Sequence, residues 1–265
     1  MSTTPTLSWT SSGATSYDVA FGMNNPPPAV ATNQAAATYT PAPLANGTTY
    51  FWQIVAHSGS TTTTGPVWSF TTSASATVTD VVIYATDLSP DALHGSWTTA
   101  NDPTSPNSTK LVTPDNGWAT TSAPLAAPVD YIDVTFTAQA ATPYALWLRM
   151  KALNDNKFND SVWVQYSDAI ANGAQAYPLS STSGLLVNLA TDTSAVSLHN
   201  WGWQNGAYWL SQATTVTFAT SGTHTLRIQV REDGVQLDQI VLSPTTYLNT
   251  APGTPTSDST IVPKP

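Results

Sequence analysis

The sequence predicts an all-β protein made of two sandwiches, a small one followed by a larger one. Short runs rich in β-branched and aromatic residues recur along the chain, and Pro, Gly, Asn and Ser separate them. No segment has the sustained 3.6-residue period of a long amphipathic helix. At 265 residues the chain is long enough for two domains with separate cores, since single domains most often contain about 100 to 150 residues.

The first predicted strands lie within residues 7–72, in the runs LSW, SYDVAFG, ATYTP, TYFWQIVA and VWSFTT. Residues 44–50 have the sequence LANGTTY, in which an Asn-Gly turn delivers an aromatic residue into the next run. Together with Trp9, Tyr17 and the closing WSFTT, this pattern resembles a fibronectin type III domain with its tyrosine corner. The resemblance implies a small antiparallel sandwich over residues 1–73 that serves as a spacer.

Composition changes mark the remaining boundaries. Residues 74–79 are small and polar, and we predict that they form a linker. The second sandwich is expected over residues 80–248. Residues 249–265 are rich in Pro, Thr and Ser and have too little apolar surface to pack alone, so they are expected to be a linker or a terminal strap. We also expect that the chain is part of a larger polypeptide.

The second sandwich is expected to contain the runs DYIDVTFTA, YALWLRMKA, SVWVQYSD, GLLVNLA, TVTFAT, HTLRIQV and VQLDQIVLS. Several of these runs alternate. In YALWLRM, which covers residues 144–150, Tyr, Leu, Leu and Met fall on one side, and Ala, Trp and Arg fall on the other. We therefore expect one side of this strand in the core and the other side half-exposed.

The charge balance excludes two classes of partner. The 16 acidic and 7 basic residues give a net charge of -9, so no basic stripe exists to neutralise phosphates and we expect no nucleic acid partner. No stretch approaches 18 consecutive apolar residues, so we expect no membrane partner. Charged residues make up 9% of the chain, against about 25% in an average protein. A surface of neutral polar groups suits neutral, hydroxyl-rich partners.

Catalysis has few candidate residues. Glu232 is the only Glu, which excludes a HExxH zinc site and a glycosidase pair of two glutamates. Glu232 and Asp233 would point to opposite faces of a strand, which is a poor arrangement for joint acid and base work. The four His residues lack metal-ligand spacing, and neither a GxSxG elbow nor a phosphate-binding Gly loop is present. We predict that the protein is not an enzyme, and an enzyme that uses Asp residues or Glu232 remains an alternative.

Aromatic residues gather outside the predicted strands of the second sandwich. They are Trp97, Trp118, Trp201, Trp203, Tyr208 and Trp209, the last four within the run NWGWQNGAYW. A sugar presents apolar C–H faces together with hydroxyls, so its binder needs flat aromatic surface beside amide, carboxylate or guanidinium groups. Trp201 and Trp203 are expected either at such a site or in the core, because Trp often fills the ends of β-sandwiches. Tyr208 and Trp209 are expected to be exposed.

Two polar groups complete the candidate site. Asn159 and Asp160 either cap a turn through side-chain to backbone bonds or face the ligand loops. Arg231, Glu232 and Asp233 stand in a row in a chain with few charges, so they either bind the ligand or form a buried, fully paired ion network.

The segment from Val81 to Leu248 resembles a known kind of module. It opens with VVIYATDL, contains YALWLRMKA and NDSVWVQYSD, and ends with TLRIQVREDGVQLDQIVLSP. These runs resemble the galactose-binding-like jelly rolls, which include carbohydrate-binding module families 6 and 35 and the malectin-like domains. The resemblance implies a jelly-roll sandwich that binds a polysaccharide or oligosaccharide with loop aromatics at one end or on the concave sheet face.

The same resemblance makes calcium a candidate cofactor. In family 6 and 35 modules two acidic residues of the first strand and an Asp of the last strand commonly help to bind a structural calcium ion. The matching first-strand positions here are Tyr84 and Thr86, with Asp87 next along the chain, and Asp238 matches the last-strand carboxylate. Of this acidic set only the last-strand member is clearly present.

These observations together predict non-catalytic polysaccharide binding by the second sandwich, with the first as a spacer. We expect an extracellular or cell-surface location, as for accessory modules of exported bacterial enzymes. The alternative is a structural or adhesive extracellular protein that acts through self-association or protein contacts.

Overall fold

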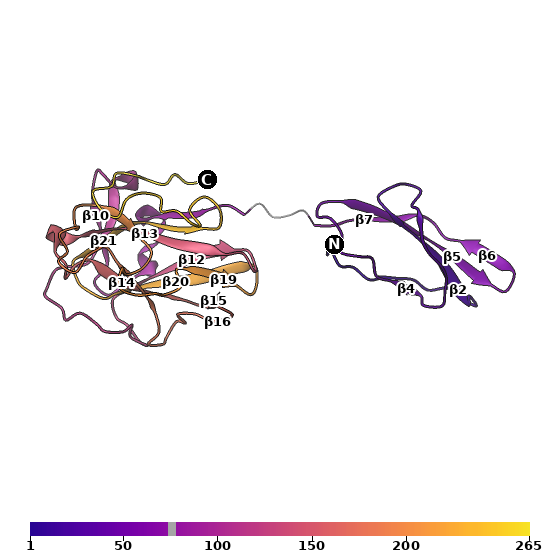
Figure 1. Cartoon of the computed structure of the whole chain (residues 1–265), viewed down its shortest axis with the longest axis horizontal. Coiled ribbons are helices and arrows are strands. Elements are labelled where there is room, and N and C mark those ends of the chain that lie inside the picture. Colours follow the sequence, from indigo (N-terminus) through magenta and orange to yellow (C-terminus); the bar gives the residue numbers. More distant parts are fainter. Residues whose placement is uncertain (74–77) are drawn as a thin grey trace. The chain divides into compact units, whose positions relative to one another are not determined.

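The structure is a computed structural model that describes residues 1–73 and 78–265 (Figure 1). The chain divides into two compact units, Met1–Thr77 and Val78–Pro265. Residues 74–77, which form most of the predicted linker, lie outside the described residues. Within the described ranges no helix has the length and apolar character needed to cross a membrane.

The described part of the first unit contains seven strands. They are β1 (Leu7–Ser8), β2 (Ser16–Gly22), β3 (Ala29–Gln34), β4 (Thr38–Tyr39), β5 (Thr49–Ser58), β6 (Thr61–Thr64) and β7 (Trp68–Thr71). One antiparallel sheet has the order β3-β2-β5-β6, with β7 also paired to β5, and β1 pairs with β4. β2 buries Tyr17, Val19 and Phe21 in alternation, because successive side chains of a strand point to opposite faces.

The loop predicted to be a tyrosine corner is closed by a hydrogen bond. The phenol oxygen of Tyr50 accepts the backbone N–H of Ala45 at 3.1 Å. The Tyr50 ring is buried and stacks on Phe21 with a centroid distance of 5.3 Å. This is the kind of contact that a tyrosine corner makes.

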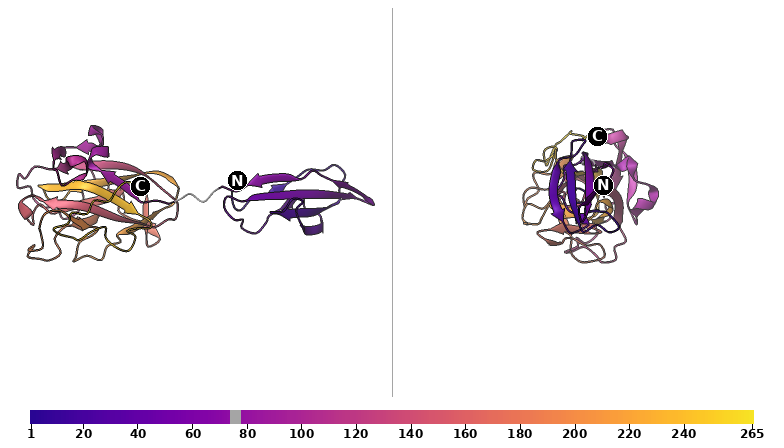
Figure 2. Two further views of the ribbon diagram at one scale, coloured as in Figure 1. Left: turned by 90° about the horizontal axis from the view of Figure 1, so that it is seen from above. Right: turned by 90° about the vertical axis from the view of Figure 1, so that its right-hand side faces the viewer.

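The second unit contains two sheets. Its strands are β8 (Val81–Tyr84), β9 (Leu93–His94), β10 (Thr98–Asn101), β11 (Thr109–Val112), β12 (Tyr131–Ala138), β13 (Tyr144–Ala152), β14 (Ser161–Tyr166), β15 (Ala169–Ala171), β16 (Ala174–Gln175), β17 (Leu185–Asn188), β18 (Gly202–Gln204), β19 (Thr215–Phe218), β20 (Gly222–Val230) and β21 (Val235–Ser243). One sheet has the order β10-β11-β21-β13-β19-β15-β16, with β18 paired to β13 and β8 to β21. The other has the order β17-β14-β20-β12-β9. The helical segments are single 3-10 turns at Ala85–Asp87, Pro90–Ala92, Pro106–Ser108 and Leu153–Asp155, and the first three, coloured violet, lie outside the strands in Figure 2.

The core of the second unit lies between its two sheets. Buried residues of β13, such as Leu146 and Leu148, pack in one cluster with Ile132 of β12 and Ile228 of β20. The alternation predicted for residues 144–150 is confirmed on its apolar side, while Arg149 on the other side is fully buried rather than half-exposed. The all-β prediction is confirmed, since strands and single helical turns make up the regular structure of the described residues.

Residues 249–265 lie against the outer side of the larger sheet. Val262 is 3% exposed and packs in a cluster with Val82, Trp203 and Val241. Its backbone N–H and carbonyl both bond the side chain of Gln239 on β21, at 3.1 and 2.8 Å. We refer to residues 249–265 as the C-terminal strap.

Four connections of the second unit meet at one end of the sandwich. They are residues 113–130, 153–160, 189–201 and 231–234. The Asn159 amide donates to the Asp115 carboxylate at 3.1 Å, and Asp233 accepts the backbone N–H of Trp118 at 3.0 Å. Side chains and backbones from distant parts of the chain therefore hold this end together.

Candidate functional site

A hollow of about 210 Å³ opens at this end of the second unit. It is lined by the β13–β14 connection, the segment that follows β17, the two residues after Ala207 and the β20–β21 turn. Five of the predicted site residues meet there, and they are Asp160, Tyr208, Trp209, Arg231 and Glu232.

Three aromatic rings at the hollow are open to solvent. Phe158 is 58% exposed, Tyr208 45% and Trp209 46%. The rings of Tyr208 and Trp209 meet edge to face with their centroids 4.6 Å apart. The exposure expected for Tyr208 and Trp209 is confirmed, and the site therefore offers flat apolar surface for a ligand to cover.

The floor of the hollow is charged and tightly bonded. One oxygen of Glu232 accepts the Ser161 hydroxyl at 2.6 Å, and its other oxygen accepts an N–H of Arg231 at 2.7 Å. The same Arg231 nitrogen also donates to Ser161 at 2.8 Å. Arg231 and Glu232 thus form the ion pair that one of the two interpretations predicts, and both also line the hollow, while ligand binding by them stays a prediction.

Asp160 lies in this floor with a perturbed acidity. Its Oδ2 accepts the Asn188 amide at 3.2 Å and the backbone N–H of Ala190 at 3.1 Å. Burial raises the pKa of Asp160 to about 8, aided by hydrogen bonding to and repulsion by the Glu232 carboxylate, while Ala190 and Arg231 oppose the rise. The Asp160 carboxyl therefore keeps its proton to higher pH than a free aspartate does.

Asn159 and Asp233 hold the site from behind and do not face a ligand. Asn159 is 1% exposed and donates to Asp115 and to the Leu153 carbonyl. Asp233 is 2% exposed, and its Oδ2 accepts the backbone N–H groups of Asn116 and Trp118 at 2.6 and 3.0 Å. Of the two alternatives for Asn159 the structure has the side-chain to backbone bond, to the Leu153 carbonyl, and the ligand-binding role predicted for Asp233 is corrected because protein partners surround its carboxylate.

Trp118 belongs to a second hollow of about 180 Å³ that Arg231 also lines. The ring is half-buried, and the exposed side chains of Leu125 and Val129 line the same space. Arg231 lines both hollows. Its side chain therefore connects the predicted site around Trp209 with the one around Trp118.

The site role predicted for Trp97 is wrong, and of the two placements expected for Trp201 and Trp203, at the site or in the core, the buried one is found. Their exposed fractions are 3%, 0% and 1%, so no ligand can stack on them. Trp97 fills the core between the two sheets. The other two flank Gly202 of β18, which pairs with β13 and lies beneath the C-terminal strap. The Trp203 indole donates to the Thr260 carbonyl of that strap at 3.2 Å, which explains why this ring is covered.

Sequence reasoning missed Phe158 as a site residue. It lies in the polar run NDNKFNDS, whose predicted site residues are Asn159 and Asp160. An isolated aromatic residue inside a polar turn was the available signal, since such a turn has no core for the ring to enter.

Calcium does not fit the positions that the resemblance points to. Asp238 forms a buried ion pair with Arg149. The Tyr84 hydroxyl donates to the Val262 carbonyl at 3.0 Å, and the Thr86 hydroxyl accepts from Asn107 at 3.0 Å. In the part of the chain that the structure describes, no three His, Cys, Asp or Glu side chains cluster to hold a metal ion.

No family model and no curated protein matches the chain. Among solved structures, it is similar to a carbohydrate-binding module of Cellvibrio mixtus lichenase 5A in complex with cellotriose, at 14% identity and a TM-score of 0.37, over 64% of this chain and 100% of that one. It is also similar to a family 35 carbohydrate-binding module from Clostridium thermocellum, at 10% identity and a TM-score of 0.34, over 62% and 98%. The C-terminal family 6 module of a marine laminarinase from Zobellia galactanivorans matches at 11% identity and a TM-score of 0.34, over 62% and 98%.

Proposed function

We propose that the second unit binds a polysaccharide or oligosaccharide, without cleaving it, in the hollow that Phe158, Tyr208 and Trp209 border. The first unit, a fibronectin type III-like domain, acts as a spacer, and the protein works outside the cell or at its surface. One observation carries the proposal: exposed aromatic rings stand beside a rigid floor of hydrogen-bonding groups.

The chemistry of the hollow suits a neutral sugar. The rings offer faces for the C–H groups of a pyranose, and the partly exposed Arg231 side chain offers hydrogen bonds to its hydroxyls. The floor is fixed by bonds within the protein, so little order has to be created when a sugar arrives. We expect weak affinity, of about 4 to 8 kcal/mol, or millimolar to micromolar dissociation constants.

The carboxyl pair in the floor is not arranged for hydrolysis. Glu232 is 4% exposed, and both of its oxygens are engaged by Ser161 and Arg231. A glycosidase of the retaining kind needs a carboxylate free to attack the sugar, and an inverting one needs space for a water between its two carboxyls. We therefore expect no release of reducing sugar from any polysaccharide that the protein binds.

The experiment measures binding of the whole chain to soluble β-glucan, xylan, galactomannan and dextran by affinity electrophoresis and calorimetry. Trp209→Ala is expected to weaken binding at least ten-fold, equivalent to about 1.4 kcal/mol, because an exposed ring that borders the hollow is removed. Phe158→Ala should weaken it in the same direction. Trp68→Ala is the matched control, since this ring is 38% exposed but lies on the first unit.

Equal affinity of the wild type and Trp209→Ala for a bound polysaccharide would show that the hollow is not the site. If the wild type binds none of the four polysaccharides, the result favours the alternative of a structural or adhesive protein. The mass of the chain in solution would then test self-association.

A further inference from the structure

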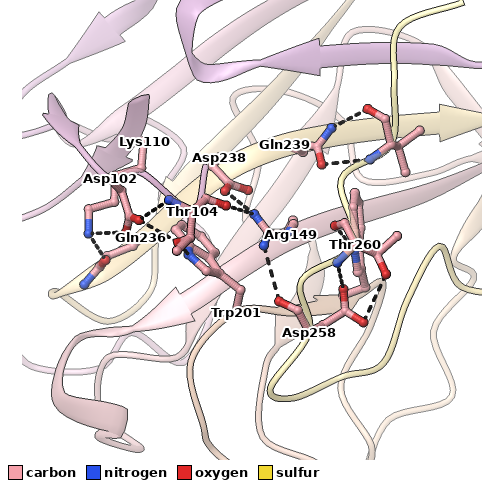
Figure 3. Close-up of polar contacts among 12 residues, drawn as sticks. Asp102, Thr104, Lys110, Arg149, Trp201, Gln236, Asp238, Gln239, Asp258 and Thr260 are labelled. Carbon is pink, nitrogen blue, oxygen red and sulfur yellow. Dashed lines mark hydrogen bonds and ion pairs between the residues drawn. The ribbon is translucent and has the colours of Figure 1, made fainter. Parts of the chain in front are cut away.

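A fully buried ion pair lies in the second unit away from the hollow (Figure 3). Arg149 of β13 and Asp238 of β21 both have side chains that are 0% exposed, and an Arg149 N–H donates to the Asp238 carboxylate. The register between these strands shifts here, because Arg149 pairs with Gln239 while the next residue pairs with Leu237. Asp238 is therefore the extra residue of a β-bulge, a feature that often redirects a side chain.

Further groups converge on the same guanidinium. Arg149 donates to the Asp258 carbonyl at 3.3 Å and lies 3.5 Å from the Thr104 carbonyl. Its guanidinium carbon stands 4.9 Å from the centre of the Trp201 ring, which is a cation–π contact. Oxygen atoms from three separate segments thus surround one cationic centre, a role that a bound metal ion often has.

Two more aspartates of this region also have cationic partners from the protein. Lys110 of β11 bonds the Asp102 carboxylate at 3.0 Å and the Gln236 side chain at 2.8 Å. Lys264 of the C-terminal strap pairs with Asp87, in the 3-10 turn that follows β8. The chain has only seven Lys and Arg residues, and three of them serve here.

These pairings explain why calcium does not fit. A calcium ion takes about six to eight oxygen ligands and prefers free carboxylates. Asp238 occupies the matching last-strand position and Asp87 directly follows the matching first-strand position Thr86, and Arg149 and Lys264 already pair with these two carboxylates. A divalent cation would have to displace a guanidinium that is itself held by two carbonyls and an aromatic ring.

We propose that the cationic side chains of Arg149, Lys110 and Lys264 take the place of a structural calcium ion in this unit, so that the sandwich and its C-terminal strap are stabilised without a metal. The strap contributes both a carbonyl, from Asp258, and a charge, from Lys264. It is therefore an integral part of the metal-independent arrangement.

The first test is the thermal unfolding of the whole chain in EDTA and in millimolar calcium chloride. The melting temperature is expected to be the same within about 1 °C in the two solutions. A calcium-dependent rise in the wild type that Asp238→Asn removes would overturn the proposal. Sugar binding plays no part in this measurement, so its outcome is independent of the proposed function.

The second test removes the central cation. Arg149→Met leaves Asp238 buried without its partner, and the melting temperature should fall by about 10 °C or more. Arg227→Met is the matched control, because Arg227 forms a two-bond pair with Asp133 that is partly exposed, and its removal should lower the melting temperature by at most about 3 °C.

The double variant Arg149→Met and Asp238→Leu keeps the test informative if the single variant fails to fold. Removing both charges leaves no unpaired ion, so the double variant should melt above Arg149→Met, with no gain from calcium. A double variant as unstable as Arg149→Met, or one that calcium stabilises, would overturn the proposal.

Discussion

Trp201 and Trp209 have opposite environments although eight positions separate them in the sequence. Trp201 precedes β18, and its indole donates to the Thr104 hydroxyl at 3.0 Å beneath the Arg149 guanidinium. Trp209 follows β18 by several residues and is 46% exposed. Small and polar residues flank both rings in the sequence, so the local sequence does not distinguish them. The pairing of β18 with β13 buries Trp201 and leaves Trp209 accessible to a ligand.

Replacement of Trp118 would show whether the hollow around Trp209 and the hollow around Trp118 bind one ligand together. Since Arg231 lines both, an extended oligosaccharide that stacks on Trp209 is expected to reach Trp118 as well. Trp118→Ala should weaken binding of a hexasaccharide about ten-fold, while binding of a disaccharide stays within two-fold. Leu125→Ala, which trims an exposed aliphatic group of the same hollow, is the control in calorimetry. Equal losses for both ligand lengths would contradict a shared site.

Asp160 is expected to make stability depend on pH. The unfolded carboxyl ionises near pH 4, whereas the folded pKa is about 8. Between these values the folded protein holds a proton that the unfolded chain releases, so the free energy of unfolding falls as pH rises from about 4 to about 8. The slope from one such proton is at most about 1.4 kcal/mol per pH unit.

Asp160→Asn should remove this part of the slope, because the amide can accept the Asn188 and Ala190 bonds and donate toward Glu232. Urea unfolding at pH 5, 6.5 and 8 would measure it. Asp238, whose pKa burial raises to about 7, keeps its own contribution to the pH dependence in the variant.

Asp192→Asn is the control, since hydrogen bonds from Ser194 and Ser197 lower the pKa of Asp192 to about 2, below this range. An unchanged slope in Asp160→Asn would contradict the assignment.

At the scale of elements, the contact between β18 and the C-terminal strap is the least tolerant of change. A Cβ placed on Gly202 would lie 2.0 Å from the Pro255 carbonyl oxygen. Gly202→Ala should therefore displace the strap and lower the melting temperature by about 4 to 10 °C. Tryptophan emission should move to longer wavelength as Trp203 loses its bond to Thr260.

Gly206→Ala is the matched control for that prediction. Its added methyl would meet only the Thr214 methyl group, at 3.2 Å, which can move slightly. Similar losses in the two variants, or an unshifted emission in Gly202→Ala, would contradict the role assigned to the strap.

The strap also explains what the sequence could and could not predict. Alternation in residues 144–150 identified β13 and its buried apolar side, because period and burial are both local properties of a strand. The other side of β13 appeared half-exposed in the pattern, yet Arg149 is buried by residues about 50 and 110 positions away along the chain. Such long-range cover leaves no local period, and for the same reason the sequence leaves two placements open for Trp203, at the site or in the core.

The candidate site was predictable to the extent that its residues lie in loops. Rings and charges in loops are available to partners, which predicts Tyr208, Trp209 and Arg231 as site residues, and the structure places them at one hollow. Asn159 and Asp233 also lie in loops at this end of the sandwich, but their side chains are buried. Their hydrogen bonds to Asp115 and to the Trp118 backbone join segments far apart in sequence, which no local pattern records.

At the scale of the whole molecule, the scarcity of charge predicts how binding responds to salt. Charged residues are 9% of the chain, and Arg231 is engaged with Glu232. If the ligand is a neutral glycan, its dissociation constant should change less than two-fold between 50 and 500 mM sodium chloride, because salt screens charge and not ring stacking. A ten-fold loss of affinity by calorimetry over this range would instead indicate an anionic ligand.

The two hydrogen bonds by which Asp233 holds the backbone of Asn116 and Trp118 should affect the kinetics of ligand binding. A loop whose shape is set before any encounter need not search for its bound form. Association should then proceed in one step at a rate that grows linearly with sugar concentration, and differences in affinity among sugars should reside mostly in how fast each one leaves.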